Sequence, residues 1–266
     1  MPTLEIFPGL TLNYLDLNPA GRSAVLLLHG LGVSSNSWQM QVPALVEAGY
    51  RVLAPDAPGF GQSSYPGKKN GIAEMAADFA GLLRALATGP VYVAGISMGG
   101  AHALQLVLDH PELVSKLVLV NTFAHLRPAH LSGWLYFGSR AALVHTLGLK
   151  TQARLVAKHL FPAPEQAELR RMAIEQIVQA SPQGYRAAMR ALWRFDVRHR
   201  LGAVSIPTLV VTASGDRTVR PETQRALAQG IPNARQAIVH NAGHAVIIDQ
   251  PQEFNRLLLN FFESVR

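Results

Sequence analysis

The feature that most constrains the fold of this chain is an alternation of short apolar runs with amphipathic stretches. Six runs lack a regular polar alternation and are rich in aliphatic and β-branched residues, at 24–28, 51–54, 91–94, 116–120, 208–212 and 236–239. Strands that are buried on both faces have this composition. Amphipathic helical stretches such as 72–87 and 101–110 lie between them. The alternation predicts an α/β fold with a mostly parallel central sheet and helices on both faces.

Two segments depart from this alternation. Residues 4–7 and 11–17, separated by Pro8-Gly9, predict an antiparallel hairpin at one edge of the sheet. After Asn121 only helical patterns follow until a strand begins near Pro207. We therefore predict a core made of residues 1–122 and 201–266, and an inserted helical lid made of residues 123–200.

The composition excludes several classes of protein. The chain has 266 residues, of which 48% are hydrophobic, which is enough for a large core. It has no cysteine, which excludes disulfides, thiol chemistry and Cys-based zinc sites. The N-terminus has no basic residue ahead of an apolar run, and no apolar stretch approaches the roughly 18 residues of a membrane helix. We expect no membrane span and a cytoplasmic location.

The positive charge is concentrated in one segment. The formal net charge is +7, and residues 123–200 contain 12 Lys and Arg against 4 Asp and Glu, an excess of +8. We expect this charge to lie on a solvated outer face of helices. The alternative is that it attracts anionic substrates or surfaces. No nucleic-acid-binding motif accompanies it, so we expect no nucleic-acid partner.

The segment Gly95-Ile96-Ser97-Met98-Gly99 is the most informative for chemistry. It contains the pattern G-x-S-x-G directly after a predicted strand and before a predicted helix. A serine at such a sharp turn has strained backbone, and side chains two residues away on either side would collide, so glycine is required there. The turn exposes the hydroxyl above the sheet, next to the free N–H groups of the helix. Ser97 is therefore the predicted nucleophile.

A serine hydroxyl needs an adjacent base, and the base needs an acid to orient it. Of ten histidines, only His244 lies in a loop that follows a predicted strand at the carboxyl edge of the sheet. Asp216 also follows a predicted strand, and the order Ser, Asp, His along the chain is one in which such triads occur on folds of this kind. Asp249, a predicted helix N-cap, and Asp196, at the end of the predicted lid, are the rival acids. We predict a triad of Ser97, Asp216 and His244.

A reaction at a carbonyl group also needs donors for the oxyanion. His29-Gly30-Leu31-Gly32 follows the first buried strand, and its two glycines let the backbone come close to a reacting carbonyl. We assign the N–H groups of Leu31 and Met98 as donors, with Gly32 as the alternative to Leu31. We expect His29 to make hydrogen bonds within its own loop.

These motifs together resemble the α/β-hydrolase fold family, in its lid-bearing carboxylesterase and enol-lactonase branch. The resemblance extends over nearly the whole chain and is carried by five segments in the family's order, namely residues 29–32, 56–63, 95–100, 215–216 and 243–244. The resemblance implies a serine hydrolase that needs no metal and no organic cofactor. Serine at the nucleophile position disfavours the related dehalogenases and epoxide hydrolases, which have aspartate there. Ala245 stands where the relatives that cleave carbon–carbon bonds usually have tryptophan.

The lid contains many aromatic and aliphatic residues, most of which we expect to be ordinary packing. Trp134, Phe137 and Trp193 are the candidates for substrate binding, since a lid over a sheet lines its pocket partly with apolar groups. A medium acyl chain, an aromatic ester or a carboxylate-bearing lactone would each fit.

We predict a carboxylesterase that acts on small-molecule esters through an acyl-enzyme intermediate. The alternatives are a lactonase, a thioesterase or a carbon–carbon bond hydrolase on the same triad, and a ligand receptor with slow turnover. The sequence leaves the physiological substrate and the oligomeric state open.

Overall fold

The computed structural model describes residues 1–67, 71–126 and 131–264, without the side chains of residues 131–133, 136, 137, 141, 143 and 145. Within this part of the chain, eight strands form one sheet in the order β1-β2-β4-β3-β5-β6-β7-β8. The strands are β1 (Thr3–Phe7), β2 (Leu10–Leu17), β3 (Ala24–Leu28), β4 (Arg51–Pro55), β5 (Val91–Ile96), β6 (Val114–Val120), β7 (Thr208–Ala213) and β8 (Ala234–Val239). The pairs β1–β2 and β2–β4 are antiparallel and the others are parallel, which confirms both the edge hairpin and the parallel core.

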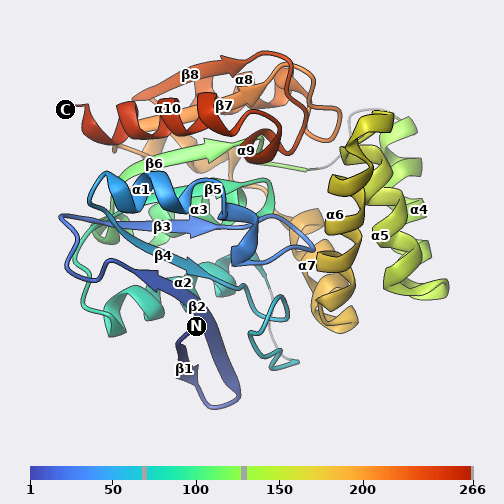
Figure 1. Cartoon of the computed structure of the whole chain (residues 1–266), viewed down its shortest axis with the longest axis horizontal. Helices are drawn as coiled ribbons and strands as arrows, with labels where there is room; N and C mark the ends of the chain where they lie inside the picture. Colours follow the sequence, from blue (N-terminus) through green and yellow to red (C-terminus); the bar gives the residue numbers. More distant parts are fainter. Residues whose placement is uncertain (68–70, 127–130, 265–266) are drawn as a thin grey trace.

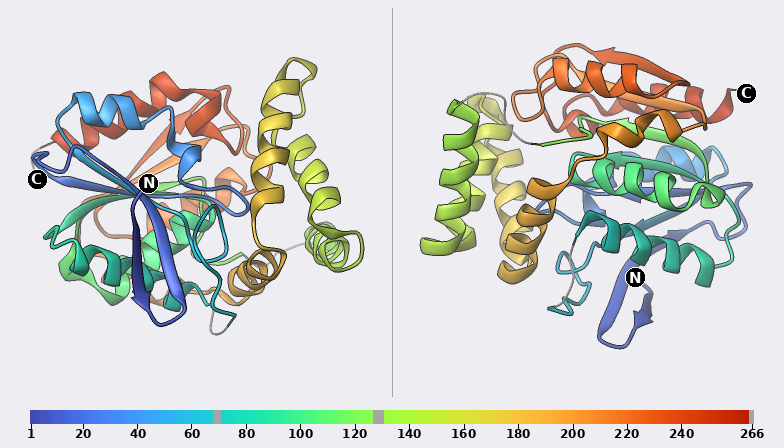
Figure 2. Two further views of the ribbon diagram at one scale, coloured as in Figure 1. Left: turned by 60° about the horizontal axis from the view of Figure 1, so that its bottom comes forward. Right: turned by 180° about the vertical axis from the view of Figure 1, so that it is seen from behind.

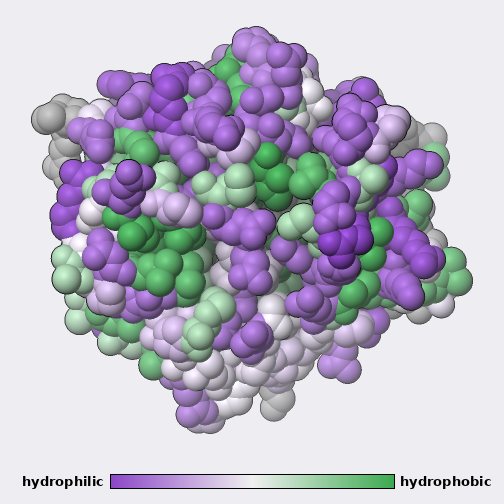
Figure 3. Space-filling model, viewed as in Figure 1, coloured by the Kyte–Doolittle hydropathy of each residue, from purple (hydrophilic) through white to green (hydrophobic). Residues whose placement is uncertain are grey.

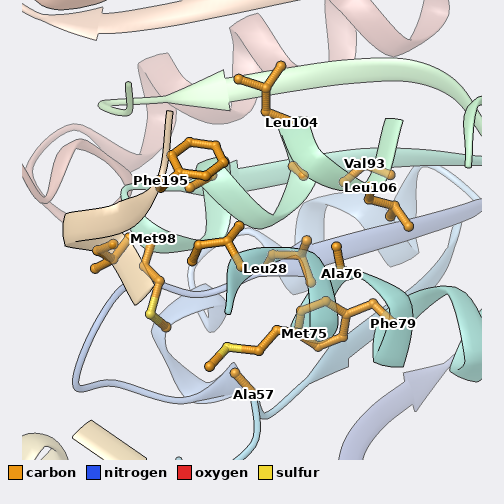
Figure 4. Packing of buried hydrophobic residues seen from close by; sticks show 14 of the residues in the cluster. Leu28, Ala57, Met75, Ala76, Phe79, Val93, Met98, Leu104, Leu106 and Phe195 are labelled. Carbon is orange, nitrogen blue, oxygen red and sulfur yellow. The ribbon is translucent and has the colours of Figure 1, made fainter. Parts of the chain in front are cut away.

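Helices cover both faces of this sheet (Figure 1). They are α1 (Val42–Glu47), α2 (Ile72–Ala85), α3 (Met98–Asp109), α8 (Pro221–Gly230), α9 (Val246–Asp249) and α10 (Pro251–Glu263). Successive residues of β3 point to opposite faces: Leu26 packs with the cluster that contains α2 and α3, and Leu27 packs with the cluster that contains α1 and α10. Figure 4 shows part of the first cluster, where Leu106 of α3 lies near Val93 of β5, and Phe79 lies near Ala76 on α2. The apolar runs of the sequence are therefore strands buried on both faces.

One strand differs from this expectation. The sequence predicts 236–239 to be buried on both faces, but β8 is the last strand of the sheet and only partly covered. Ile238 is 49% exposed. An edge strand has a neighbour on one side only, so it can be rich in apolar residues without being enclosed.

In the part of the chain that the structure describes, four α-helices lie between β6 and β7, as the sequence predicts for the inserted segment. They are α4 (Leu131–Thr146), α5 (Gly148–Leu160), α6 (Ala167–Gln179) and α7 (Pro182–Arg194). Figures 1 and 2 show them together at one end of the molecule, beyond the edge at which the parallel strands end. Helix α7 begins after Ser181, whose hydroxyl accepts the Gly184 N–H (3.2 Å), with Pro182 in the first turn. The exact boundaries of a separate lid unit stay a prediction.

The two ends of this insertion lie side by side at its base. The Val197 N–H donates to the Ala124 carbonyl (3.0 Å), and His125 and Asp196 form an isolated antiparallel bridge. Further along, the Ser181 N–H donates to the Gly59 carbonyl of the core (2.9 Å). The helices are thus attached to the core at their base and at the start of α7. No helix within the described residues is long and apolar enough to cross a membrane.

Candidate active site

Ser97 occupies the turn between β5 and α3. Its φ of 55° and ψ of −114° are unusual for an L-residue with a side chain. Its N–H donates to the Val120 carbonyl (2.9 Å), and its carbonyl accepts from Thr122 Oγ1 (2.7 Å) and from the Ala101 N–H (3.1 Å). These bonds stabilise the strained turn and direct the Ser97 side chain into a cavity beyond the end of the sheet.

Glycine is required on both sides of Ser97 because two backbone segments cross there. A Cβ atom at Gly95 would collide with the Gly99 carbonyl, and a Cβ atom at Gly99 would collide with the Leu28 carbonyl. These are contacts with backbone, which cannot move aside as a flexible side chain can. The steric argument made from the sequence is confirmed.

The start of α3 provides backbone donors next to Ser97. The first intrahelical hydrogen bond runs from the Ala101 N–H to the Ser97 carbonyl, so the preceding N–H groups have no acceptor within the helix. Met98 carries the first of these N–H groups. Its side chain is completely buried and points into the core near Leu28 and Met75 (Figure 4). Met98 is not among the described residues that line the cavity, so its candidate contribution is limited to the backbone N–H next to Ser97.

The loop after β3 lies against the same turn. A Cβ atom at Gly30 would lie 3.7 Å from the Ser97 Cβ, and Leu31 lines the same cavity as Ser97. Gly32 is not among the described residues that line this cavity and instead packs under the ring of Tyr185, with a φ of 87°. This arrangement favours Leu31 over Gly32 as the second donor.

His29 holds this loop in place, as the sequence predicts, and also ties it to a neighbouring loop. Its Nδ1 lies 2.8 Å from the Gly30 carbonyl, and its Nε2 accepts the Ala57 N–H at 2.9 Å. These partners assign the proton to Nδ1. Burial lowers the pKa of His29, against the opposing influence of Asp56, so the ring stays neutral. A neutral imidazole whose two nitrogens are both hydrogen-bonded holds the loop in position and is not available for proton transfer.

Asp216 and His244 form a hydrogen-bonded pair. Asp216 Oδ2 lies 2.8 Å from His244 Nδ1, and the Asp216 side chain is completely buried. Asp216 Oδ1 accepts the N–H groups of Thr218 (2.8 Å) and Val219 (2.9 Å), which fix the orientation of the carboxylate. The acceptor on Nδ1 leaves His244 Nε2 as the nitrogen that can accept a proton.

His244 and Ser97 line the same cavity. Among the described residues, no hydrogen bond joins their side chains. Such a hydrogen bond often forms only when substrate binds. Its absence therefore does not exclude Ser97 and His244 as a nucleophile and its base.

The two rival acids have other partners. Asp249 Oδ2 accepts the Gly243 N–H (2.8 Å), so it supports the loop next to His244 through its backbone. Asp249 does not cap α10, whose N-cap residue is Gln250. Asp196 is bonded to the Arg198 guanidinium (2.7 and 2.9 Å) at the base of the insertion. Asp216 is the acid that contacts the His244 ring.

Two residues that sequence reasoning missed hold this pair in place. Asn121 follows β6, and its Nδ2 donates to the carbonyls of Gly243 (3.1 Å) and His244 (2.8 Å), while its Oδ1 accepts the Ala213 N–H (2.9 Å). Gln224 of α8 donates to Asp216 Oδ2 (3.2 Å). Asn121 stands at the carboxyl end of a buried strand, which is the one sequence signal that could have drawn attention to it. Gln224 is an ordinary helical residue in the sequence and gives no such signal.

Asn121→Asp should destabilise the protein by about 2 to 4 kcal/mol, since it turns a buried donor for two carbonyls into an acceptor that repels them. For a chain of this size, this predicts a fall in Tm of roughly 4 to 16 °C. The kcat should fall as well, because the His244 loop loses its anchor. Thermal unfolding and steady-state kinetics check both effects. Asn233→Asp, at an exposed amide bonded to the Ser205 carbonyl, is the matched control, and an equal loss there would contradict the argument.

The cavity that contains Ser97 has a volume of about 840 Å³ and a mostly apolar lining. Trp134 and Trp193, two of the three predicted substrate-binding residues, both line it, and their rings form a T-shaped pair with centroids 4.7 Å apart. The side chain of Phe137, the third, lies outside the part of the chain that the structure describes. Within that part, no group of three or more His, Asp or Glu side chains is arranged to hold a metal ion.

Comparison with known proteins agrees with this architecture. The pattern of the alpha/beta hydrolase fold family matches residues 23–251. The RutD protein of Variovorax paradoxus (strain S110), to which a carbamate hydrolase activity is ascribed, is 36% identical over 96% of this chain and 97% of its own. An enol-lactonase from Burkholderia xenovorans LB400 superposes with a TM-score of 0.90, at 26% identity over 99% of this chain and 100% of that one. A thermophilic esterase from Thermogutta terrifontis superposes with a TM-score of 0.86, at 26% identity over 98% of each chain.

The chain belongs to the α/β-hydrolase fold family and is a hydrolase, as the sequence predicts. A hydrolase of this kind acts on a small-molecule substrate.

Proposed function

We propose that this protein hydrolyses carboxylic esters through an acyl-enzyme intermediate. The observation that carries the proposal is the pair of Asp216 and His244, which leaves His244 Nε2 as the acceptor beside the cavity that also contains the Ser97 hydroxyl. A hydroxyl at a strained strand-to-helix turn, an oriented imidazole and free backbone N–H groups are the parts that acyl transfer needs.

In the first half of the reaction, Ser97 Oγ attacks the ester carbonyl carbon while His244 Nε2 takes its proton. The N–H groups of Leu31 and Met98 donate to the oxyanion of the tetrahedral intermediate. The bond to the alkoxy oxygen then breaks, and His244 returns the proton to the leaving alcohol. An ester now joins the acyl group to Ser97.

In the second half, His244 takes a proton from a water molecule whose oxygen attacks the acyl carbon. The bond to Ser97 Oγ breaks, the proton returns to Ser97, and the carboxylic acid leaves. Asp216 stabilises the imidazolium that forms in each half without itself taking the proton.

The comparisons suggest what kind of ester to test first. A lactone is a cyclic ester, so the esterase and enol-lactonase names of the similar structures agree with cleavage of an acyl–oxygen bond. A carbamate hydrolase is the second candidate function, favoured by the 36% identity to the RutD protein. A carbamate presents the same carbonyl to the serine but with nitrogen on one side.

A substrate panel tests these two functions. We would measure kcat/KM for p-nitrophenyl esters of increasing chain length, for two lactones, and for a p-nitrophenyl N-alkyl carbamate. We expect turnover of esters, with a dependence on chain length that follows the apolar lining of the cavity. Turnover confined to the carbamate would favour the second function. A single fast turnover followed by negligible steady-state release would instead indicate a ligand receptor.

A further inference from the structure

The charged residues that line the Ser97 cavity are all basic. Four arginines contribute to its wall, and the described lining residues include no Asp or Glu; the four are Arg140, Arg186, Arg190 and Arg194. Part of the basic charge of the insertion does lie on an outer surface, as the sequence predicts. Arg171, for example, is exposed and bonded to Glu168 and Glu175. On the face seen in Figure 3, hydrophilic side chains cover much of the inserted helices at the right of the molecule.

The four arginines are not equivalent. Arg190 and Arg194 are exposed, and they also line a smaller neighbouring cavity whose wall contains the carboxylates of Glu74 and Asp196. Arg140 and Arg186 are half-buried and line the Ser97 cavity but not this neighbouring one. They therefore contribute positive charge to the cavity without a carboxylate on its described wall to offset it.

Two side chains that contact the Arg140 guanidinium are Tyr185 and Gln152. Its Nη2 donates to the Tyr185 hydroxyl (3.0 Å), and with the Gln152 amide turned so that its oxygen faces Arg140, that oxygen accepts from Nε (2.7 Å). Hydrogen bonds of this kind orient the guanidinium. Among the described residues, Arg186 makes no hydrogen bond or ion pair.

Arg140 lines the same cavity as Ser97 and His244. The ring of Tyr185, which binds Arg140, lies 2.9 Å from where a Cβ atom on Gly32 would be, next to Leu31 in the loop after β3. Because Ser97 and Arg140 both line one cavity of about 840 Å³, a single substrate molecule can contact both.

We propose that Arg140 and Arg186 form a carboxylate-binding subsite, and that the preferred substrate is an ester or lactone that also carries a free carboxylate. The guanidinium fork matches a carboxylate in shape and charge, and a partly buried site screens the attraction less than bulk water does. The proposal rests on the proposed ester hydrolysis and specifies its substrate class. It also revises the sequence-based expectation that the basic charge of the insertion only faces solvent.

A matched pair of esters tests the subsite. Mono-p-nitrophenyl pimelate carries a free carboxylate, and its methyl ester has nearly the same shape without the charge. We expect the wild-type protein to prefer the anionic ester by kcat/KM. Arg140→Gln and Arg186→Gln should each reduce this preference by roughly 10- to 100-fold, as expected for the loss of a charge-assisted hydrogen bond. The loss should appear mainly in KM, because binding at a distance from the carbonyl is felt equally in the ground and transition states.

Arg171→Gln is the control, since it removes the same charge from the insertion at an exposed ion pair on α6 and should leave the preference unchanged. Tyr185→Phe, which removes the hydroxyl partner of Arg140 but no charge, tests whether the orientation of Arg140 matters. Labelling of Ser97 by a neutral fluorophosphonate reports that each variant is folded. An unchanged preference in both Arg140→Gln and Arg186→Gln would overturn the subsite. Failure of the wild-type protein to hydrolyse either ester would instead contradict the proposed function.

Discussion

Replacing Ser97 by alanine should lower kcat by roughly 10³- to 10⁶-fold, because the triad acts as a unit and only binding and the oxyanion donors remain. The fold should be preserved, since the bonds that stabilise the turn come from the backbone of Ser97 and the side chain of Thr122. Steady-state kinetics on an activated ester measures the loss. A neutral fluorophosphonate should attach to Ser97 in the wild-type protein and be located there by mass spectrometry.

Ser37 provides a matched control for this experiment. It lines the same cavity, and its buried hydroxyl has no hydrogen-bond partner within the described residues. Unlike Ser97, it has no base assigned to it. Ser37→Ala should therefore retain most of the activity. An adduct on Ser37, or a Ser97→Ala variant with wild-type turnover, would remove Ser97 from the mechanism.

Asp216→Asn should lower kcat by roughly 10³- to 10⁴-fold, as expected when the base is held in the wrong tautomer. The N–H groups of Thr218 and Val219 require an oxygen at the Oδ1 position, so the new NH₂ group must replace Oδ2. That group would donate to His244 Nδ1, which shifts the ring proton to Nε2. A protonated Nε2 cannot accept the proton of Ser97. Parallel measurements of kcat and Tm separate this effect from unfolding.

Asp249→Asn is the matched control for Asp216. The side-chain oxygen of asparagine can still accept the Gly243 N–H, so the loop next to His244 should keep its support. Burial raises the pKa of Asp249, which makes a neutral side chain acceptable at this position. We expect activity within a few-fold of wild type. A large loss in Asp249→Asn together with an active Asp216→Asn would make Asp249 the orienting acid.

The sequence alone predicts the sheet and the main candidates of the site because these depend on local patterns. The apolar runs of 24–28 and 208–212 are long enough for strands and too short for helices, and each coincides with a strand of the parallel sheet. Gly95 and Gly99 mark the turn at Ser97, since a side chain at either position would collide with backbone. Parallel strands end at one edge of their sheet, which brings loops that are distant in sequence to the same place.

Tertiary structure decides the questions that depend on contacts between distant segments. Asp216 and Asp249 both lie in loops near His244, and only the hydrogen bonds assign one to the ring and the other to the backbone. Asn121 connects the ends of two strands to the His244 loop, over separations of more than 90 residues.

The direction of a long side chain on the insertion is likewise a tertiary property. Arg171 faces solvent and Arg140 faces the cavity, although both are arginines on amphipathic helices of the same basic segment. Helical periodicity assigns residues to a face, but which face borders a cavity depends on how the helices pack over the sheet. The sequence therefore determined the fold and the order of the candidate triad residues along the chain, while packing alone decided which basic side chains of the insertion line the cavity.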